Sequence, residues 1–286
     1  EGGVKAYEMP GIDGSYGYPW YLGTDMSWWN IDALSKFGVS EESLPTTFDE
    51  LYDLAMEAAK QGGSAPIISS LPEIIITSGD DGKFNFNTDE NVDFLQKYVE
   101  LYKAKAMPVE VLSDNYTGNA QLYKQEKVLW TTATSSYPTE LKTDNPGLIE
   151  KTVVTKRMGQ PPLFVQGIAV SAKSKAPAAA RAFAKFATNT ENQIEFVKLA
   201  QGFLPGTKEA AADPSKFAEK SDIELQNKAV ELAAESMKTA VDPTNVMWTE
   251  DMKTNMGQQM ALAMRGDITA KEALDAAVKY GNDQLS

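Results

Sequence analysis

Aromatic side chains gather in one stretch of the chain, residues 16–51, and could bind a small ligand. Three of the five tryptophans of the chain lie there: Trp20, Trp28 and Trp29. Tyr21 and the carboxylate of Asp25 lie between them. An aromatic ring can stack on the apolar face of a sugar, while a carboxylate accepts hydrogen bonds from its hydroxyl groups. Other rings of the stretch must pack a core, so we expect it to serve both purposes.

Trp248 is a second aromatic candidate, in the polar segment 245–249 just before a predicted helix. An indole at the start of a helix and beside polar residues can act as a platform for a sugar ring. Burial statistics give a place in the core about equal weight. Residue type alone leaves both interpretations open.

Small polar residues follow a predicted strand at residues 127–132. Open α/β sheets bind ligands beyond the carboxyl ends of their strands, which makes Ser135, Ser136 and Tyr137 candidate contacts. Tyr137 is the preferred one. The alternative is that Thr134, Ser135 and Ser136 only cap the helix that follows.

Composition excludes several classes of function. The chain of 286 residues has 27 basic and 40 acidic side chains, and its net charge of -13 disfavours binding to nucleic acid or to anionic lipid headgroups. Without cysteine and histidine, disulfides, thiolate chemistry, Ser-His-Asp triads and His-rich metal sites are unavailable. We expect no metal and no cofactor. Catalysis by carboxylates alone remains open.

Helices and short apolar strands alternate along the chain, which indicates the α/β class. A Thr-x-x-Glu capping box at Thr47 predicts a helix that ends at Gly62-Gly63. A further helix is expected over residues 92–102, where Val92, Leu95, Val99 and Tyr102 share a face. Buried strands are expected at residues 65–68 and 163–170, and residues 84–86 alternate between apolar and polar types.

The C-terminal part of the chain predicts two amphipathic helices. The first carries methionines at four-residue spacing, which we assign to the core: Met252, Met256, Met260 and Met264. The second starts at a capping box on Thr269 and buries an apolar face that includes Leu274. Asp80-Asp81-Gly82-Lys83 departs from the alternation of a calcium loop, so a solvated turn is expected there.

Several of these motifs together resemble the bacterial extracellular solute-binding proteins of family 1, the sugar-binding components of ABC importers. The opening stretch contains Tyr18-Pro19, the pair Trp29-Asn30 and the ungapped element 45–51, PTTFDEL. The helix at 174–188, the segment 190–193 and the exit 202–207, GFLPGT, also match the family pattern. Members of the family usually carry a Gly-Gly or Gly-rich pair just before the strand at 163–170, whereas only Gln166-Gly167 remains in this chain. Gln166 is therefore a lesser candidate for a ligand contact. Maltose-binding-type members of the family have an aromatic residue at the position of Trp248, and this resemblance favours a role for Trp248 in ligand binding over a place in the core.

The resemblance implies a two-lobed type II periplasmic-binding-protein fold. It assigns residues 1–19 and 163–212 to the N-terminal lobe, and residues 20–162 and 213–286 to the C-terminal lobe. Gly159-Gln160-Pro161-Pro162 is then the second crossover. The start of the chain resembles mid-protein sequence, so we expect that an upstream part of the N-terminal lobe is missing.

The resemblance also implies a function. Two lobes would close over a sugar or oligosaccharide and deliver it to a membrane permease. Trp20, Tyr21, Asp25, Ser135, Ser136, Tyr137, Gln166 and Trp248 would be the ligand-binding residues. The protein would be extracellular, as a lipoprotein on the cell surface, or periplasmic. It would be a monomer when complete, whereas these 286 residues alone should associate through their open lobe.

Two other classes of protein are alternatives to a sugar-binding protein. A carbohydrate-active enzyme could use paired carboxylates, for example Asp13 or Asp25 with Glu73. A glycan-attachment module is usually a β-sandwich and does not fit a helix-rich chain. The resemblance extends over nearly the whole chain and favours a binding protein that is not an enzyme.

Overall fold

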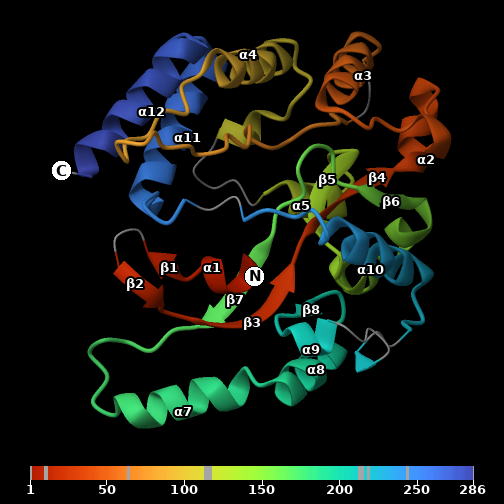
Figure 1. Cartoon of the computed structure of the whole chain (residues 1–286). Helices are drawn as coiled ribbons and strands as arrows, with labels where there is room; N and C mark the ends of the chain where they lie inside the picture. The colour runs from red at the N-terminus through yellow and green to blue at the C-terminus, as the bar shows by residue number, and fades with distance from the viewer. Residues whose placement is uncertain are drawn as a thin grey trace. The chain divides into compact units, whose positions relative to one another are not determined.

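The structure is a computed structural model of the chain (Figure 1). The structure describes residues 2–9, 12–62, 65–112, 118–211, 216–217, 220–242 and 245–285. The chain divides into two compact units, and each is built from separate stretches of sequence. Unit 1 comprises Glu1–Trp28 and Thr132–Asp242, and unit 2 comprises Trp29–Thr131 and Pro243–Ser286.

Unit 1 contains both short strands and helices. They are α1 (Gly2–Lys5), β1 (Glu8–Met9), β2 (Ile12–Ser15), β3 (Tyr18–Gly23), α6 (Tyr137–Asp144), β6 (Thr152–Lys156), β7 (Phe164–Ile168), α7 (Pro177–Ala187), α8 (Thr190–Leu199), β8 (Leu204–Pro205), α9 (Lys208–Ala211) and α10 (Glu224–Ser236). Two more strands, β4 (Asp25–Asn30) and β5 (Trp130–Thr134), run from one unit into the other.

Unit 2 is mainly helical. Its helices are α2 (Ile31–Leu34), α3 (Phe48–Lys60), α4 (Asp89–Lys103), α5 (Asn119–Lys124), α11 (Glu250–Arg265) and α12 (Ala270–Gln284). Helix α11 packs against α12 and α4. The four methionines of α11 are buried with exposed fractions of at most 8%, which confirms the prediction that they form core.

Two of the sheets have three strands each, in the orders β7-β3-β8 and β5-β4-β6. Strand β3 is antiparallel to both of its neighbours. The register of β3 against β7 shifts between Pro19 and Tyr21, so Trp20 is the extra residue of a bulge. In the other sheet, Trp28 and Trp29 of β4 are fully buried. The expectation that part of the aromatic stretch packs a core is therefore confirmed.

The predicted capping boxes are present. The side chain of Thr47 accepts a hydrogen bond from the backbone N–H of Glu50, and the Glu50 carboxylate accepts from the N–H of Thr47. Thr269 and Glu272 form the same box at α12. Gly62 follows α3 with a φ of 69°, as expected after a helix, and Gly63 lies outside the described residues.

The prediction of a strand at residues 65–68 is wrong in backbone geometry, although Ile67 and Ile68 are fully buried. The carbonyls of Pro66 and Ile67 accept hydrogen bonds from the N–H groups of Leu129 and Trp130 at 3.1 and 3.2 Å. Pro66 has no N–H to donate in return, so a regular ladder does not form. Phe84 and Phe86 are buried and Asn85 between them is exposed, which follows the alternation of apolar and polar types in the sequence.

Three other predicted elements exist with shifted ends. The strand expected at residues 127–132 is β5, the strand expected at 163–170 is β7, and the helix expected at 174–188 is α7. The compact units cut the chain after Trp28, Thr131 and Asp242, whereas the lobes predicted from the sequence change after residues 19, 162 and 212. Residues 212–215 lie outside the described part, and the lobe boundaries stay a prediction. No helix among the described residues has the length and apolar character that a membrane span requires.

Candidate functional site

Trp20 and Tyr21 of β3 form a partly exposed aromatic cluster in unit 1. Side chains of successive strand residues normally point to opposite faces, but the bulge at Trp20 brings both rings together, with centroids 5.2 Å apart. Phe196 of α8 lies 4.4 Å from Trp20 and stacks on Tyr21 at 4.9 Å. Phe203 lies 4.8 Å from Tyr21. This packing fixes the rings, so a ligand that stacks on them need not order them first.

Gln193 of α8 holds the strand beneath this cluster. Its amide nitrogen donates to the carbonyls of Pro19 at 3.0 Å and Thr188 at 2.7 Å, and its amide oxygen accepts from the N–H of Gly206 at 2.6 Å. The side chain is fully buried, where each of these hydrogen bonds is costly to lose. Gln193 therefore fixes β3 relative to α8 and β8.

Asp25, at the start of β4, forms an ion pair with Arg157. The guanidinium lies 3.2 Å from the carboxylate, and the two side chains are only 15% and 16% exposed. Arg157 follows β6 directly, so the pair ties the end of β6 to the neighbouring strand β4. A ligand hydroxyl that binds Asp25 would share the carboxylate with this guanidinium.

Two of the three candidate residues after β5 are buried inside unit 1, and Ser136 between them is partly exposed. Ser135 is 1% exposed, and its hydroxyl donates to the carbonyl of Gly202. Tyr137 is also 1% exposed and lies 5.5 Å from Trp28. Ser136 occupies the N-cap position of α6, but its hydroxyl hydrogen-bonds that of Thr134 and makes no capping bond. The capping alternative is therefore wrong for Ser136.

Gln166 of β7 is exposed and pairs with Tyr21 across the sheet. Its neighbour Gly167 must be a glycine, because a Cβ there would lie 2.3 Å from the hydroxyl oxygen of Tyr7. Burial, followed by the nearby carboxylate of Asp242, raises the pKa of the Tyr7 phenol. Gln166 therefore lies beside β3, the strand that carries Trp20 and Tyr21 of the aromatic cluster.

Trp248 lies in unit 2, partly exposed at the start of α11. Its ring meets Phe84 and Phe86 edge-on, with centroids 5.0 and 5.2 Å away. A Cβ at Gly281 of α12 would lie 2.8 Å from both the Trp248 and Phe84 rings. The indole is therefore held by two rings and by close packing at Gly281, and it is only partly exposed.

Seven of the eight predicted site residues belong to unit 1, and Trp248 belongs to unit 2. Sequence reasoning missed the residues that position them: Arg157, Gln193, Phe196, Phe203 and Gln226. Gln226 donates to the carbonyl of Ser135 at 2.6 Å while only 1% exposed. The contacts that tie them to Asp25, Pro19, Trp20, Tyr21 and Ser135 span from 91 residues (Gln226 to Ser135) to 182 residues (Phe203 to Tyr21), so no local pattern identifies these contacts. The family motifs gave a signal for three of them: Gln193 ends the matched segment 190–193, Phe196 follows it on the same helix, and Phe203 lies in the matched exit 202–207.

No group of carboxylates in the described ranges has the arrangement of a metal site. The turn with Asp80 and Asp81 is organised by a 2.8 Å bond from the Gly79 N–H to the Lys83 carbonyl, and the Asp81 carboxylate accepts from the Lys83 N–H at 3.1 Å. The site residues are therefore rings, amides, hydroxyls and one paired carboxylate. Such a set can bind a neutral polar ligand by stacking and hydrogen bonds.

Comparison with known protein families decides the class. The family model described as bacterial extracellular solute-binding protein matches residues 2–225, more than half of the chain. This chain is a bacterial extracellular solute-binding protein. A search of curated proteins found no significant match.

Solved structures share the fold of this solute-binding protein. An oligosaccharide periplasmic-binding protein from a Synechococcus species, so described and crystallised with zinc, has a TM-score of 0.87 at 21% identity, over 99% of this chain and 75% of its own. The GacH receptor of Streptomyces glaucescens, solved without ligand and with acarbose, has a TM-score of 0.76 at 16% identity, covering 97% and 72%. The ABC substrate-binding protein Lmo0181 from Listeria monocytogenes, in complex with cycloalternan, has a TM-score of 0.76 at 20% identity, covering 99% and 74%. The two-lobed type II periplasmic-binding fold predicted from the sequence is confirmed.

Proposed function

We propose that this solute-binding protein captures a sugar or oligosaccharide for an ABC importer. The observation that carries the proposal is the family match over residues 2–225. Several proteins of the same fold were crystallised with oligosaccharides or related ligands, among them acarbose and cycloalternan. The partners would be a carbohydrate and the permease subunits of the importer, and the protein would act outside the cytoplasmic membrane or as an anchored lipoprotein.

Aromatic stacking would supply most of the affinity. The Trp20-Tyr21 cluster and Trp248 each present a partly exposed ring surface that neighbouring rings hold in place. Rigid rings of this kind suit the apolar face of a pyranose, because stacking requires little ordering of the protein. The proposal gives one stacking surface to each unit.

Polar contacts would fix the orientation of the sugar. Gln166 is exposed beside Tyr21, and Asp25 could accept from hydroxyls while paired with Arg157. Ser136 is partly exposed, whereas Ser135 and Tyr137 are buried in this structure. A direct contact from Ser135 or Tyr137 would therefore require that the turn after β5 move, and without that movement they would position Ser136.

A panel of oligosaccharides titrated by calorimetry tests the binding surfaces. Tyr21→Ala and Trp248→Ala should each weaken binding by about 1 to 3 kcal/mol, the range for loss of a buried aromatic contact. Tyr16→Ala is the matched control, because Tyr16 is a 47% exposed aromatic of unit 1 outside the candidate site. Unchanged affinity in the Tyr21 and Trp248 double variant would contradict the assignment.

Product analysis separates binding from catalysis. Labelled oligosaccharides incubated with the protein should be retained and recovered intact, because we propose a carrier and not an enzyme. Appearance of shortened products would support the carboxylate mechanism instead, and Asp25→Asn together with Glu73→Gln would then identify the catalytic pair.

A further inference from the structure

Two neighbouring hydroxyl groups lie at the carboxyl end of β5, where open α/β sheets bind ligands. Thr134 is the last residue of the strand, and its hydroxyl lies 2.8 Å from that of Ser136. Both side chains are partly exposed, and in the described part of the chain neither hydroxyl has another hydrogen-bond partner. A hydroxyl donates one hydrogen bond and accepts two, so the bond between them leaves one donor and several acceptor positions for another molecule.

A role as a helix cap does not account for this arrangement. Ser136 is the N-cap residue of α6, but its hydroxyl accepts no hydrogen bond from the backbone of that helix. The lobe that the sequence predicts to be incomplete comprises residues 1–19 and 163–212, so Thr134 and Ser136 lie outside it. The hydroxyl pair therefore belongs to a part of the protein that is expected to be complete.

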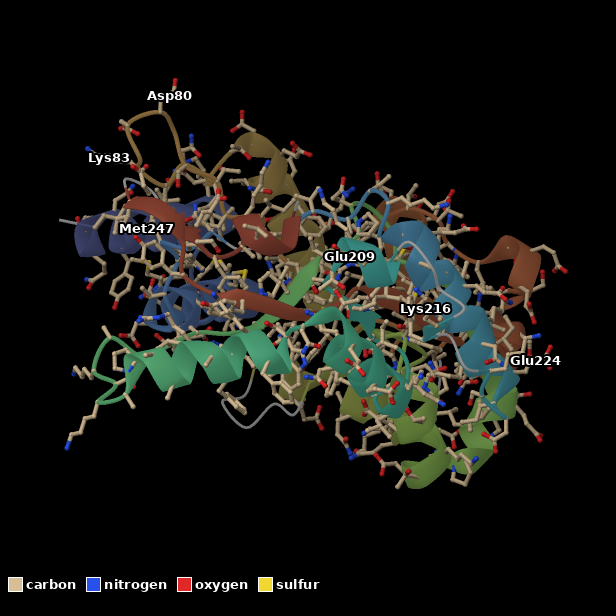
Figure 2. The ribbon with its side chains drawn as sticks, turned by 60° about the horizontal axis from the view of Figure 1, so that its bottom comes forward. Asp80, Lys83, Glu209, Lys216, Glu224 and Met247 are labelled. Carbon is tan, nitrogen blue, oxygen red and sulfur yellow. The ribbon has the colours of Figure 1, made fainter. Side chains whose placement is uncertain are left out.

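The turn that carries the pair is held by hydrogen bonds to its backbone. The indole N–H of Trp28 in β4 donates to the carbonyl of Ala133 at 3.0 Å. The amide of Gln226 donates to the carbonyl of Ser135 at 2.6 Å. Gln226 lies in the first turn of α10, the helix that begins at Glu224, which Figure 2 labels. The backbone on both sides of Thr134 is therefore fixed, to β4 by one hydrogen bond and to α10 by the other.

Gly202 holds the same turn from a third direction. Its carbonyl accepts a hydrogen bond from the hydroxyl of Ser135. Its φ of 102° favours glycine, and a Cβ there would lie 2.5 Å from the backbone nitrogen of Ser136 and 2.6 Å from its Cα. The next residue, Phe203, packs on Tyr21 with ring centroids 4.8 Å apart. Gly202 therefore determines where Ser136 lies, and its segment also contacts the aromatic cluster.

We infer, on the basis of the proposed function, that the hydroxyls of Thr134 and Ser136 together bind two adjacent hydroxyl groups of the sugar. Adjacent hydroxyls of a pyranose lie about as far apart as the two protein oxygens, so each protein oxygen can face one of them. All four groups donate and accept, and hydrogen bonds in such a chain strengthen one another. Thr134 is then a further ligand contact, and Gly202 is the residue that positions the pair.

Calorimetry of the full chain with a panel of sugars, from glucose and mannose to maltotetraose, tests the hydroxyl pair. Thr134→Val removes one hydroxyl at nearly constant volume and should raise Kd by about 3- to 10-fold, as for the loss of one hydrogen bond. Thr134→Ser retains the hydroxyl and should keep the wild-type Kd. Thr143→Val is the matched control, because the Thr143 hydroxyl donates to the carbonyl of Thr139 within α6, and it should not change Kd. An unchanged Kd in Thr134→Val would overturn the inference.

Two variants test the positioning role of Gly202. Gly202→Ala should raise Kd by about tenfold or more, because Ser136 must move to make room for the methyl group. Ser135→Ala removes only the hydrogen bond to the Gly202 carbonyl and should raise Kd by about threefold, which tests the same contact without a clash. Gly38→Ala is the control for backbone strain alone, since Gly38 has a φ of 75° and its added Cβ would meet no atom within 4 Å.

The number of binding sites per chain, measured in the same titrations, separates misfolding from misplacement. An unfolded fraction lowers this number, whereas displaced hydroxyls raise Kd and leave the number unchanged. Unchanged Kd values in both Gly202→Ala and Ser135→Ala would overturn the positioning role.

Monodeoxy analogues of the sugar that binds tightest test the preference for adjacent hydroxyls. Two analogues that each lack one hydroxyl of the same adjacent pair should bind the wild type about 3- to 10-fold more weakly. Both losses should shrink in the variant that combines Thr134→Val and Ser136→Ala, because the protein partners are gone. Equal losses in the wild type and the double variant would overturn the inference. A wild type that binds none of the sugars would refute the proposed function itself, whereas sugar binding that the variants leave unchanged would refute only the role of the hydroxyl pair.

Discussion

Helices α7 of unit 1 and α12 of unit 2 look alike as sequences and differ as structures. Both place small and apolar residues on one face. In α12 that face is covered, and Leu274 is fully buried against the rest of unit 2. In α7 only Ala184 is buried, and Phe183 and Phe186 are exposed. Helical periodicity therefore identifies an apolar face of a helix but does not identify what covers that face.

The largest difference should appear when one apolar side chain of each helix is shortened. Leu274→Ala leaves a cavity in unit 2 and should lower the free energy of unfolding by about 2 to 5 kcal/mol. Phe183→Ala removes an exposed ring and should change it by about 0.5 kcal/mol or less. Urea unfolding at low protein concentration measures both. Equal losses would mean that the α7 face is covered in solution.

Contacts of α12 with the aromatic rings give the next test. Gly281→Ala places a methyl group 2.8 Å from Trp248 and Phe84, and should cost about 1 to 3 kcal/mol in stability. It should also shift the fluorescence of Trp248. Gly257→Ala in α11 is the matched control, because the nearest atom is Leu71 Cδ1 at 4.0 Å, and it should be neutral or stabilise by up to about 1 kcal/mol. The same response in both variants would contradict the close packing at Gly281.

The N-terminal caps of the two helices differ as well. Thr269 caps α12 through its hydroxyl, and Thr269→Ala should cost about 1 kcal/mol. Ala176 is the N-cap of α7 and has no side chain that can accept a hydrogen bond. Ala176→Ser should therefore stabilise α7 by a few tenths of a kcal/mol up to about 1 kcal/mol. Thermal unfolding of both variants measures the effects, and a destabilised Ala176→Ser protein would show that a hydroxyl cannot reach the first turn of α7.

A fall in pH should produce the smallest of these differences between α12 and α7. Hydrogen bonds from the backbone N–H and then the hydroxyl of Thr269 lower the pKa of Glu272. A lowered folded-state pKa means that the stabilisation is complete above the ordinary pKa of the carboxyl and is lost as the pH falls through the lowered value. Hydrogen-exchange protection in the first turn of α12 should therefore decline in acid, and Glu272→Gln should remove this dependence. The first turn of α7 contains no acidic residue, so a matching decline there would refute the explanation.

Local sequence determined the helices and much of the class of this protein. The capping boxes at Thr47 and Thr269 act over three residues, so they could be predicted from the sequence and were confirmed. The methionine spacing of α11 predicted a buried face, and α11 has one. Motifs near Tyr18 and in the exit segment 202–207 led to the family, because family patterns are carried by short runs of residues.

Only the tertiary structure decided how the candidate site is built. The bulge at Trp20 depends on the register of β3 against β7. Trp20 and Trp28 belong to the same aromatic stretch, yet Trp20 is partly exposed and Trp28 is fully buried. Arg157 reaches Asp25 across 132 residues, and Gln193 reaches Pro19 across 174. Pro66 prevented a strand that its apolar neighbours predicted. Periodicity and capping are local properties of the chain, whereas ion pairs, ring contacts and register depend on which distant segments meet, and that is determined by the fold as a whole.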